Sequence, residues 1–333
     1  MENIEKLKKF SIEDIENELT RREEKRRLAS FETNKTELSD YSESNLINEL
    51  YTKEKLVYGI DDRKDLYDIP DIAVQNDADS VVAILDNSMI SDNGDGTSTI
   101  KVRNYGEAEN LCEKEPFREQ PIGCWCSGFL VGQDLIATAG HCIDENETGV
   151  PIENIRILFG FRMINKDEVN LTFENREIYK IKEILNSKLD PPLTFDPNSR
   201  QSDWAIVRLD KTVNDHNIVS INRESIKDKQ KIHIIGHPKG LPLKYADGAE
   251  VTDNSPDAFF IANTDSYGGN SGSPIFNSIT HKVEGILVRG ERDLKRNENG
   301  CYQSVVCPRV ENKPNCKGEG CTRTSEFIDH IPT

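Results

Sequence analysis

Short apolar runs separated by turn-forming residues dominate the chain from about position 80 onward. Their lengths and their content of β-branched residues are typical of strands. They lie at 81–85, 98–102, 126–131, 135–139, 155–160, 204–209, 231–236, 258–263, 273–277 and 283–288. No regular helical pattern intervenes, so the sequence predicts an all-β domain, either a sandwich or a barrel.

Two further segments of this region carry turn or helix signals. The stretch DNSMISDNGDGT, 86–97, contains Asn-Gly and Asp-Gly, which favour a hairpin. It superficially resembles a calcium loop, but that pattern needs Asp or Asn two residues after Asp92, where Gly94 stands. The sequence therefore predicts a hairpin here, and TRTSEFIDHI, 322–331, predicts a short capped helix.

The first 55 residues differ from the rest because they are rich in charge and poor in aromatic side chains. Ile4, Leu7 and Phe10 recur at helical spacing, and Ser11 followed by Asp14 resembles a helix start. The pattern predicts one or two amphipathic helices in an N-terminal extension. A flexible leader with nascent helix is the alternative.

Composition narrows the possible partners and compartments. The 333 residues carry a formal net charge of −17, which disfavours nucleic acid and anionic membrane surfaces. No apolar run approaches the roughly 20 residues of a membrane span, and the N-terminus lacks the apolar core of a secretory signal. These features favour a cytoplasmic protein. The eight cysteines point instead to disulfides and leave export open.

Three segments bring together the residue types of nucleophilic catalysis. A serine hydroxyl needs a base that titrates near neutrality and a third group that fixes the tautomer of the base. His141, Asp203 and Ser271 supply these types. They stand in CSGFLVGQDLIATAGHC, SDWAIVRLD and DSYGGNSGSP, which span 126–142, 202–210 and 265–274. Glycines beside the serine would let backbone N–H groups turn toward an oxyanion.

These segments resemble the chymotrypsin and trypsin superfamily of serine endopeptidases, including the order His, Asp, Ser along the chain. The resemblance implies two packed six-stranded antiparallel β-barrels. It implies that His141 is the general base, that Asp203 orients it, and that Ser271 attacks the peptide bond to form an acyl-enzyme. The N–H groups of Gly269 and Ser271 would form the oxyanion hole. Neither a cofactor nor a metal ion is implied, and the partner is a protein or peptide substrate.

The resemblance also bears on the cysteines. Cys126 and Cys142 have the family's spacing for the disulfide that braces the histidine loop. Tyr267 stands at the first position of the family's pocket disulfide, which should therefore be absent. The spacings of the tail cysteines do not match a standard zinc site and favour disulfides or free thiols. The sequence leaves open the pairing of Cys112, Cys124, Cys301, Cys307, Cys316 and Cys321.

One branch of the superfamily is most similar. Members activated by cleavage have Asp before the nucleophile, whereas Asn270 cannot pair with a new N-terminal ammonium. GGNSGSP and the stretch VYGIDDR, 57–63, resemble the bacterial glutamyl endopeptidases. By that analogy, residues 56–333 form the peptidase domain. Residues 1–55 are then a propeptide or a regulatory segment that docks a partner.

Specificity is expected to differ from that branch. Asp265, six residues before Ser271, would lie at the base of the primary pocket and attract Arg or Lys, with Ser266 lining the pocket. Leu287 stands where glutamyl endopeptidases have an acid-reading His. The edge formed by Val288, Arg289 and Gly290 should pair with the substrate backbone.

Three alternatives remain open. Asp265 could turn away and cap a loop. The chain could be a Glu-specific endopeptidase, or a catalytically silent peptidase scaffold kept for binding. Among the other histidines only His237, in IIGHPKG, stands in a context worth testing.

Overall fold

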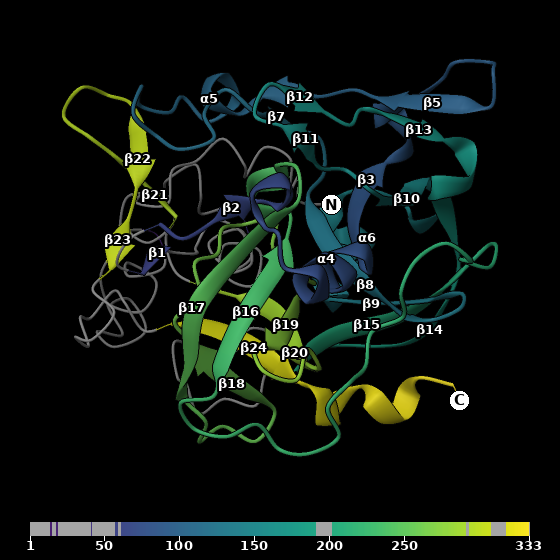
Figure 1. The fold of residues 1–333 in the computed structure, drawn as a ribbon, viewed down its shortest axis with the longest axis vertical. Coiled ribbons are helices and arrows are strands. Elements are labelled where there is room, and N and C mark those ends of the chain that lie inside the picture. Colours follow the sequence, from purple (N-terminus) through teal and green to yellow (C-terminus); the bar gives the residue numbers. More distant parts are fainter. Residues whose placement is uncertain are drawn as a thin grey trace.

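The fold was analysed in a computed structural model. It describes residues 57–58, 61–190, 202–290, 293–307 and 318–332, together with residues 14, 18 and 41. The helices predicted for the N-terminal extension lie outside the described residues. Two β-barrels lie side by side and make up most of the described chain (Figure 1).

The first barrel is a closed ring of six antiparallel strands, joined in the order β10-β14-β15-β9-β8-β3. Ile84, Phe129 and Ile206 are fully buried inside it. Strands β3, β8, β9, β10 and β15 are buried along nearly their whole length, so both faces of these strands are covered. Its strands are β3 (Val81–Asp86), β8 (Cys126–Gly132), β9 (Leu135–Thr138), β10 (Ile155–Phe159), β14 (Ile178–Leu189) and β15 (Asp203–Leu209).

The second barrel follows along the chain and is also antiparallel. The order β16-β19-β20-β24-β18-β17 is closed by pairing of β16 with β17, and β2 extends the sheet at β17. Phe260, Ile275 and Leu287 are buried in its core. Its strands are β16 (Lys231–Gly236), β17 (Lys244–Asp253), β18 (Phe259–Ala262), β19 (Pro274–Asn277), β20 (Val283–Arg289) and β24 (Glu319–Arg323). The prediction of two six-stranded barrels is confirmed.

The remaining elements are short. The predicted hairpin is present, because β4 pairs with β5 and the turn between them contains Gly94 at φ 77° and Gly96 at φ 90°. The other strands are β1 (Val57–Tyr58), β2 (Lys64–Asp65), β4 (Ile90–Asp92), β5 (Thr97–Ile100), β6 (Arg103–Asn104), β7 (Pro121–Ile122), β11 (Met163–Asn165), β12 (Glu168–Val169), β13 (Thr172–Glu174), β21 (Leu294–Arg296), β22 (Tyr302–Ser304) and β23 (Val306–Cys307). The α-helices of the described residues are α4 (Ile72–Asp79), α5 (Tyr105–Ala108) and α6 (Glu145–Thr148). Within the described chain, 3-10 helices span Leu66–Asp68, Asn87–Met89, Gly140–Cys142, Ile152–Asn154, Asn175–Glu177, Pro238–Gly240, Thr324–Glu326 and Ile328–His330.

Helix α4 is tied to both barrels. Its N-cap is Asp71, whose side chain accepts the N–H of Ala73 at 2.8 Å. Near its end, Asp77 accepts from His233 of the second barrel at 3.2 Å. Asp79 bonds His216 at 2.9 Å, and that imidazole stacks on a phenylalanine of the first barrel. No helix among the described residues has the length and apolarity to cross a bilayer.

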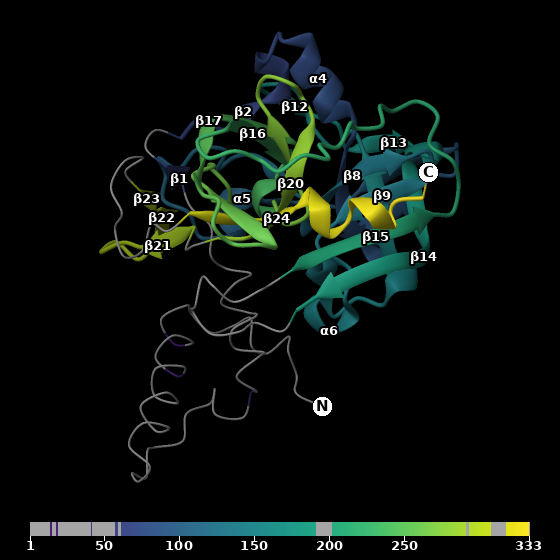
Figure 2. The ribbon, with the colours of Figure 1, turned by 90° about the horizontal axis from the view of Figure 1, so that it is seen from below.

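The C-terminal segment returns from the second barrel to the first (Figure 2). Beyond β24 the chain forms two 3-10 helices, Thr324–Glu326 and Ile328–His330, where a single short helix was predicted. His330 stacks on Trp204 of β15 at a centroid distance of 4.9 Å, and the ring of Phe327 lies tilted by 45° to the same indole at 6.5 Å. The C-terminal segment therefore packs against the outside of the first barrel.

Candidate active site

His141 stands at the open end of the first barrel. Strand β9 ends at Thr138, and the chain then turns through the 3-10 helix Gly140–Cys142. The turn brings the N–H of Gly140 to 2.6 Å from Oδ1 of Asp203. A Cβ at Gly140 would lie 3.1 Å from that oxygen and 2.9 Å from a backbone carbonyl, so only glycine fits without a shift.

Asp203 holds the imidazole of His141 in one orientation. It begins β15 and is 8% exposed. Its Oδ2 lies 2.6 Å from Nδ1 of His141, while Oδ1 accepts the backbone N–H of the same residue at 3.2 Å. Burial alone would raise the pKa of Asp203, but His141 and these hydrogen bonds outweigh burial and lower it. The carboxylate is thus ionised at neutral pH and fixes the proton of the ring on Nδ1.

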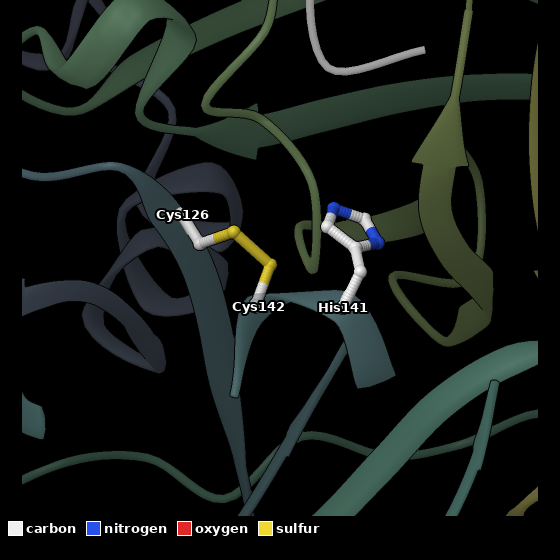
Figure 3. A group of neighbouring side chains, drawn as sticks. All are labelled: Cys126, His141 and Cys142. Atoms are coloured by element: carbon white, nitrogen blue, oxygen red, sulfur yellow. A yellow bond between two sulfur atoms is a disulfide. The ribbon is translucent and has the colours of Figure 1, made fainter. Parts of the chain in front are cut away.

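A disulfide braces this turn. Cys126 of β8 is bonded to Cys142, the residue after His141 (Figure 3). The pairing that the family resemblance implied is therefore present. Although these sulfurs lie close to the imidazole, both belong to the disulfide and cannot act as thiolate ligands of a metal ion.

Ser271 lies in the loop between β18 and β19 of the second barrel. Its carbonyl oxygen accepts the N–H of Ser127 at 2.8 Å and lies 3.5 Å from the sulfur of Cys142. The next residue, Gly272, has φ 85°, and a Cβ there would lie 2.0 Å from the Ser127 carbonyl oxygen. Glycine is therefore required for the loop to approach the first barrel this closely. The structure thus brings Ser271 next to the turn that carries His141.

The peptide between Gly268 and Gly269 has a defined orientation. The carbonyl oxygen of Gly268 accepts the N–H of Lys239, and no cis peptide occurs in the described chain. In a trans peptide the N–H points away from the carbonyl, so the N–H of Gly269 points to the side opposite Lys239. Gly269 has φ 95°, and a Cβ there would lie 2.6 Å from a backbone oxygen.

Ser127 of β8 joins the two barrels at this point, and sequence reasoning missed it. Its side chain is fully buried. The hydroxyl donates to the carbonyl of Gly269 at 3.1 Å and accepts the N–H of His237 at 2.9 Å. Only its place in CSGFLV, beside a predicted disulfide cysteine, could have drawn attention to it.

The predicted pocket residues are buried together. Asp265 is 1% exposed and accepts the N–H of Asp62 at 3.0 Å. Ser266 donates its hydroxyl to Glu319 at 3.2 Å. The Glu319 carboxylate also packs against Gly290, where a Cβ would meet it at 1.9 Å. Glu319 comes 53 residues after Ser266, and no sequence motif marked it.

The predicted substrate edge is the end of β20. Pairing with β19 reaches only Ile286, while pairing with β24 continues to Arg289 opposite Gly320. Val288 is 5% exposed. The guanidinium of Arg289 lies 4.4 Å from the ring centroid of Phe259, so this side chain packs along the barrel.

A second group of side chains could in principle hold a metal ion: Asp77, His233 and His281. Hydrogen bonds account for the short distances among these side chains, since Oδ2 of Asp77 lies 2.6 Å from His281 and 3.2 Å from His233.

His237 is buried, bonds the carbonyl of Leu241 at 2.9 Å, and has its pKa lowered by burial to about 4. It is neutral at pH 7 and supports the loop before Lys239.

The other cysteines show one long-range link. Cys112 forms a disulfide with Cys301, 189 residues away. Cys301 is thus a disulfide cysteine of the tail. Cys124 forms no disulfide, and burial raises the pKa of its thiol well above the usual value. The side chains of Cys307 and Cys316 lie outside the described residues.

Part of this chain is similar to known peptidases. Residues 126–286 match the family model of the trypsin-like peptidase domain. The VesB protease of Vibrio cholerae is 17% identical, with a TM-score of 0.45 over 81% of this chain and 66% of that chain. A Glu endopeptidase in complex with MPD is also 17% identical, with a TM-score of 0.45 over 83% of this chain and 97% of that chain. The two barrels give this chain a trypsin-like peptidase fold, and its residues 126–286 are similar to the trypsin-like peptidase domain.

Proposed function

We propose that the protein is a serine endopeptidase in which Ser271 is the nucleophile, His141 the general base and Asp203 the residue that orients the base. The observation that carries the proposal is the 2.6 Å contact between Asp203 and Nδ1 of His141, beside a turn that the Ser271 loop abuts. A buried carboxylate on one imidazole nitrogen leaves the other nitrogen to accept a proton.

The reaction follows from these roles. The Oγ of Ser271 attacks the carbonyl carbon of the scissile peptide while Nε2 of His141 takes the hydroxyl proton. The resulting oxyanion is stabilised by the N–H groups of Gly269 and Ser271. His141 then gives its proton to the leaving amine, which leaves an ester on Ser271. Water deprotonated by His141 hydrolyses the ester, and the proton returns to Ser271.

Covalent labelling tests the proposal. A fluorophosphonate should label the purified protein and fail to label Ser271→Ala. Ser91→Ala removes a hydroxyl from β4, outside the proposed machinery, and should be labelled like wild type. Equal labelling of wild type and Ser271→Ala would refute the assignment of the nucleophile. Absence of labelling in all three proteins would favour the silent scaffold.

We further propose cleavage after Arg or Lys. Asp265 and Glu319 bring two carboxylates to the segment around Ser266 and Gly290, and this negative charge favours a cationic side chain. The hydrogen bond from the Asp62 N–H to Asp265 supports the alternative in which that carboxylate caps a loop. A peptide library read on wild type, Asp265→Asn and Glu319→Gln separates the two. A preference for Arg or Lys that weakens in either variant supports the proposal, whereas cleavage after Glu or apolar residues contradicts it.

We propose that the peptidase domain begins at residue 56 and that residues 1–55 are a removable or regulatory segment. Strand β2 extends the second barrel at β17, the Asp62 N–H donates to Asp265, and β1 pairs with β23 outside the barrel. Mass spectrometry of the active protein decides between the two roles. A new N-terminus near Leu56 indicates a propeptide, and an intact Met1 in active protein indicates a regulatory segment.

A further inference from the structure

A buried ion pair, Lys239 with Asp293, lies beside the loop of Gly268 to Ser271, and the proposed mechanism does not use it. Asp293 is fully buried, and its Oδ2 lies 2.6 Å from Nζ of Lys239. The same oxygen accepts the backbone N–H of Gly268 at 3.2 Å. Burial alone would lower the pKa of Lys239, but the Asp293 carboxylate outweighs burial and raises it. Lys239 is thus charged at neutral pH.

Both members of the pair hold the same glycine. The side chain of Asp293 receives the N–H of Gly268, and the backbone N–H of Lys239 donates to the carbonyl oxygen of Gly268. Lys239 adopts the left-handed region, with φ 55°, to make this contact. A non-glycine residue rarely takes that conformation unless its surroundings fix it. The N–H and the carbonyl oxygen of Gly268 are therefore both held by hydrogen bonds, and we call this arrangement the Gly268 clamp.

This clamp sets the direction of the N–H of Gly269. Rotation of the peptide between Gly268 and Gly269 would break the hydrogen bond from Lys239 and reverse the direction of the Gly269 N–H. Asn270 is uncharged, and its side-chain oxygen has no hydrogen-bond partner among the described residues. The charge that orders this loop thus comes from Asp293, more than 20 residues beyond the nucleophile in sequence.

We infer that Lys239 and Asp293 are positioning residues that keep the oxyanion hole formed within the single chain. The inference rests on the proposed serine endopeptidase function. It means that the hole needs no new N-terminus, so removal of residues 1–55 is not what forms it. The ion pair acts on the transition state through Gly269 and touches no substrate atom.

Steady-state kinetics on a peptide ester tests the inference. Loss of one oxyanion donor typically costs on the order of 100-fold in kcat, so Asp293→Asn and Lys239→Met should lower kcat by about that factor. KM should change little, because the ground state does not use the hole. Lys239→Arg keeps the charge and should recover most of the lost activity.

The matched control is another buried ion pair of the second barrel. Lys244 lies 2.6 Å from Asp65 and is 2% exposed, but it bonds none of the glycines before the nucleophile. Lys244→Met should therefore destabilise the fold and leave kcat of the folded protein near wild type. If Lys239→Met and Lys244→Met lower kcat equally, or if neither Lys239→Met nor Asp293→Asn changes it by threefold, the inference is wrong.

A second measurement does not need catalysis. Hydrogen–deuterium exchange of the peptide covering 267–273 should be faster in Asp293→Asn than in wild type, and unchanged in Lys244→Met. Unchanged exchange in Asp293→Asn would overturn the inference even if the protein proves to be an enzyme. Faster exchange in a protein that no fluorophosphonate labels would support the clamp and reject the proposed function.

Discussion

Removing each disulfide in turn should separate stability from activity. The two bonds close loops of very different length, with sequence separations of 16 residues for Cys126–Cys142 and 189 residues for Cys112–Cys301. In the chain-entropy account, the shorter loop is worth about 3 kcal/mol and the longer about 5 kcal/mol of unfolding free energy. Replacing both cysteines of the longer loop by alanine should therefore destabilise the fold more.

Activity should follow the opposite order. Cys142 directly follows His141 and lies 3.5 Å from the Ser271 carbonyl oxygen, so the short disulfide fixes the proposed base relative to the proposed nucleophile. A displacement of about 1 Å can cost on the order of 100-fold in rate. We expect Cys126→Ala with Cys142→Ala to lower kcat between about 10- and 100-fold. The pair Cys112→Ala with Cys301→Ala should leave kcat within about twofold.

The assay combines urea unfolding of the oxidised proteins with kinetics corrected for the folded fraction. The comparison is internal, because both double variants lose one disulfide and two sulfurs. The reasoning is wrong if the short-loop variant retains full activity, or if it loses more unfolding free energy than the long-loop variant.

Three other changes have defined outcomes. Burial alone would lower the pKa of His216, but hydrogen bonds and charge from two carboxylates outweigh burial and raise it above 6.5. The stabilisation of the fold by protonated His216 is therefore complete below pH 6.5 and is lost as pH rises through the folded pKa. His216→Asn should cost more unfolding free energy at about pH 6 than at about pH 9. Gly272→Ala forces a Cβ to 2.0 Å from a backbone oxygen. We expect this variant to lose fluorophosphonate labelling and to unfold at a thermal midpoint lowered by several degrees. Labelling at the wild-type level would contradict this prediction. Asp203→Asn should keep the fold by circular dichroism and lower kcat by about 10⁴-fold, because the imidazole loses its fixed tautomer.

Most barrel strands were predictable because they are apolar runs bounded by turns. Three strands were not. β14 is largely exposed and carries charges such as Lys182 and Glu183, so its period-2 signal is weak. β17 is interrupted by Gly248 at φ 74°. β24 is short and lies in the cysteine-rich tail. Helix α4 was missed because its sequence, IAVQNDAD, has little apolar periodicity.

The candidate site likewise contains residues that sequence motifs predicted and residues that they did not. Motifs mark His141, Asp203 and Ser271 as candidates because the proposed chemistry needs those residue types at fixed places. Ser127, Asp293 and Glu319 act through contacts between residues distant in sequence, and no local pattern encodes such contacts. The hydrogen bond of Asp265 to the Asp62 N–H depends on how the N-terminal stretch docks, which spacing along the chain does not reveal.

The contacts of Ser127 also determine when during synthesis the cleft can appear. Strand β8 is made early, the loop that carries Ser271 much later, and β24 later still. Thr322 of β24 donates to the carbonyl oxygen of Asp203 at 2.9 Å. The groups that surround the cleft therefore meet only after nearly the whole domain has left the ribosome. A nascent chain therefore lacks the complete arrangement of these groups.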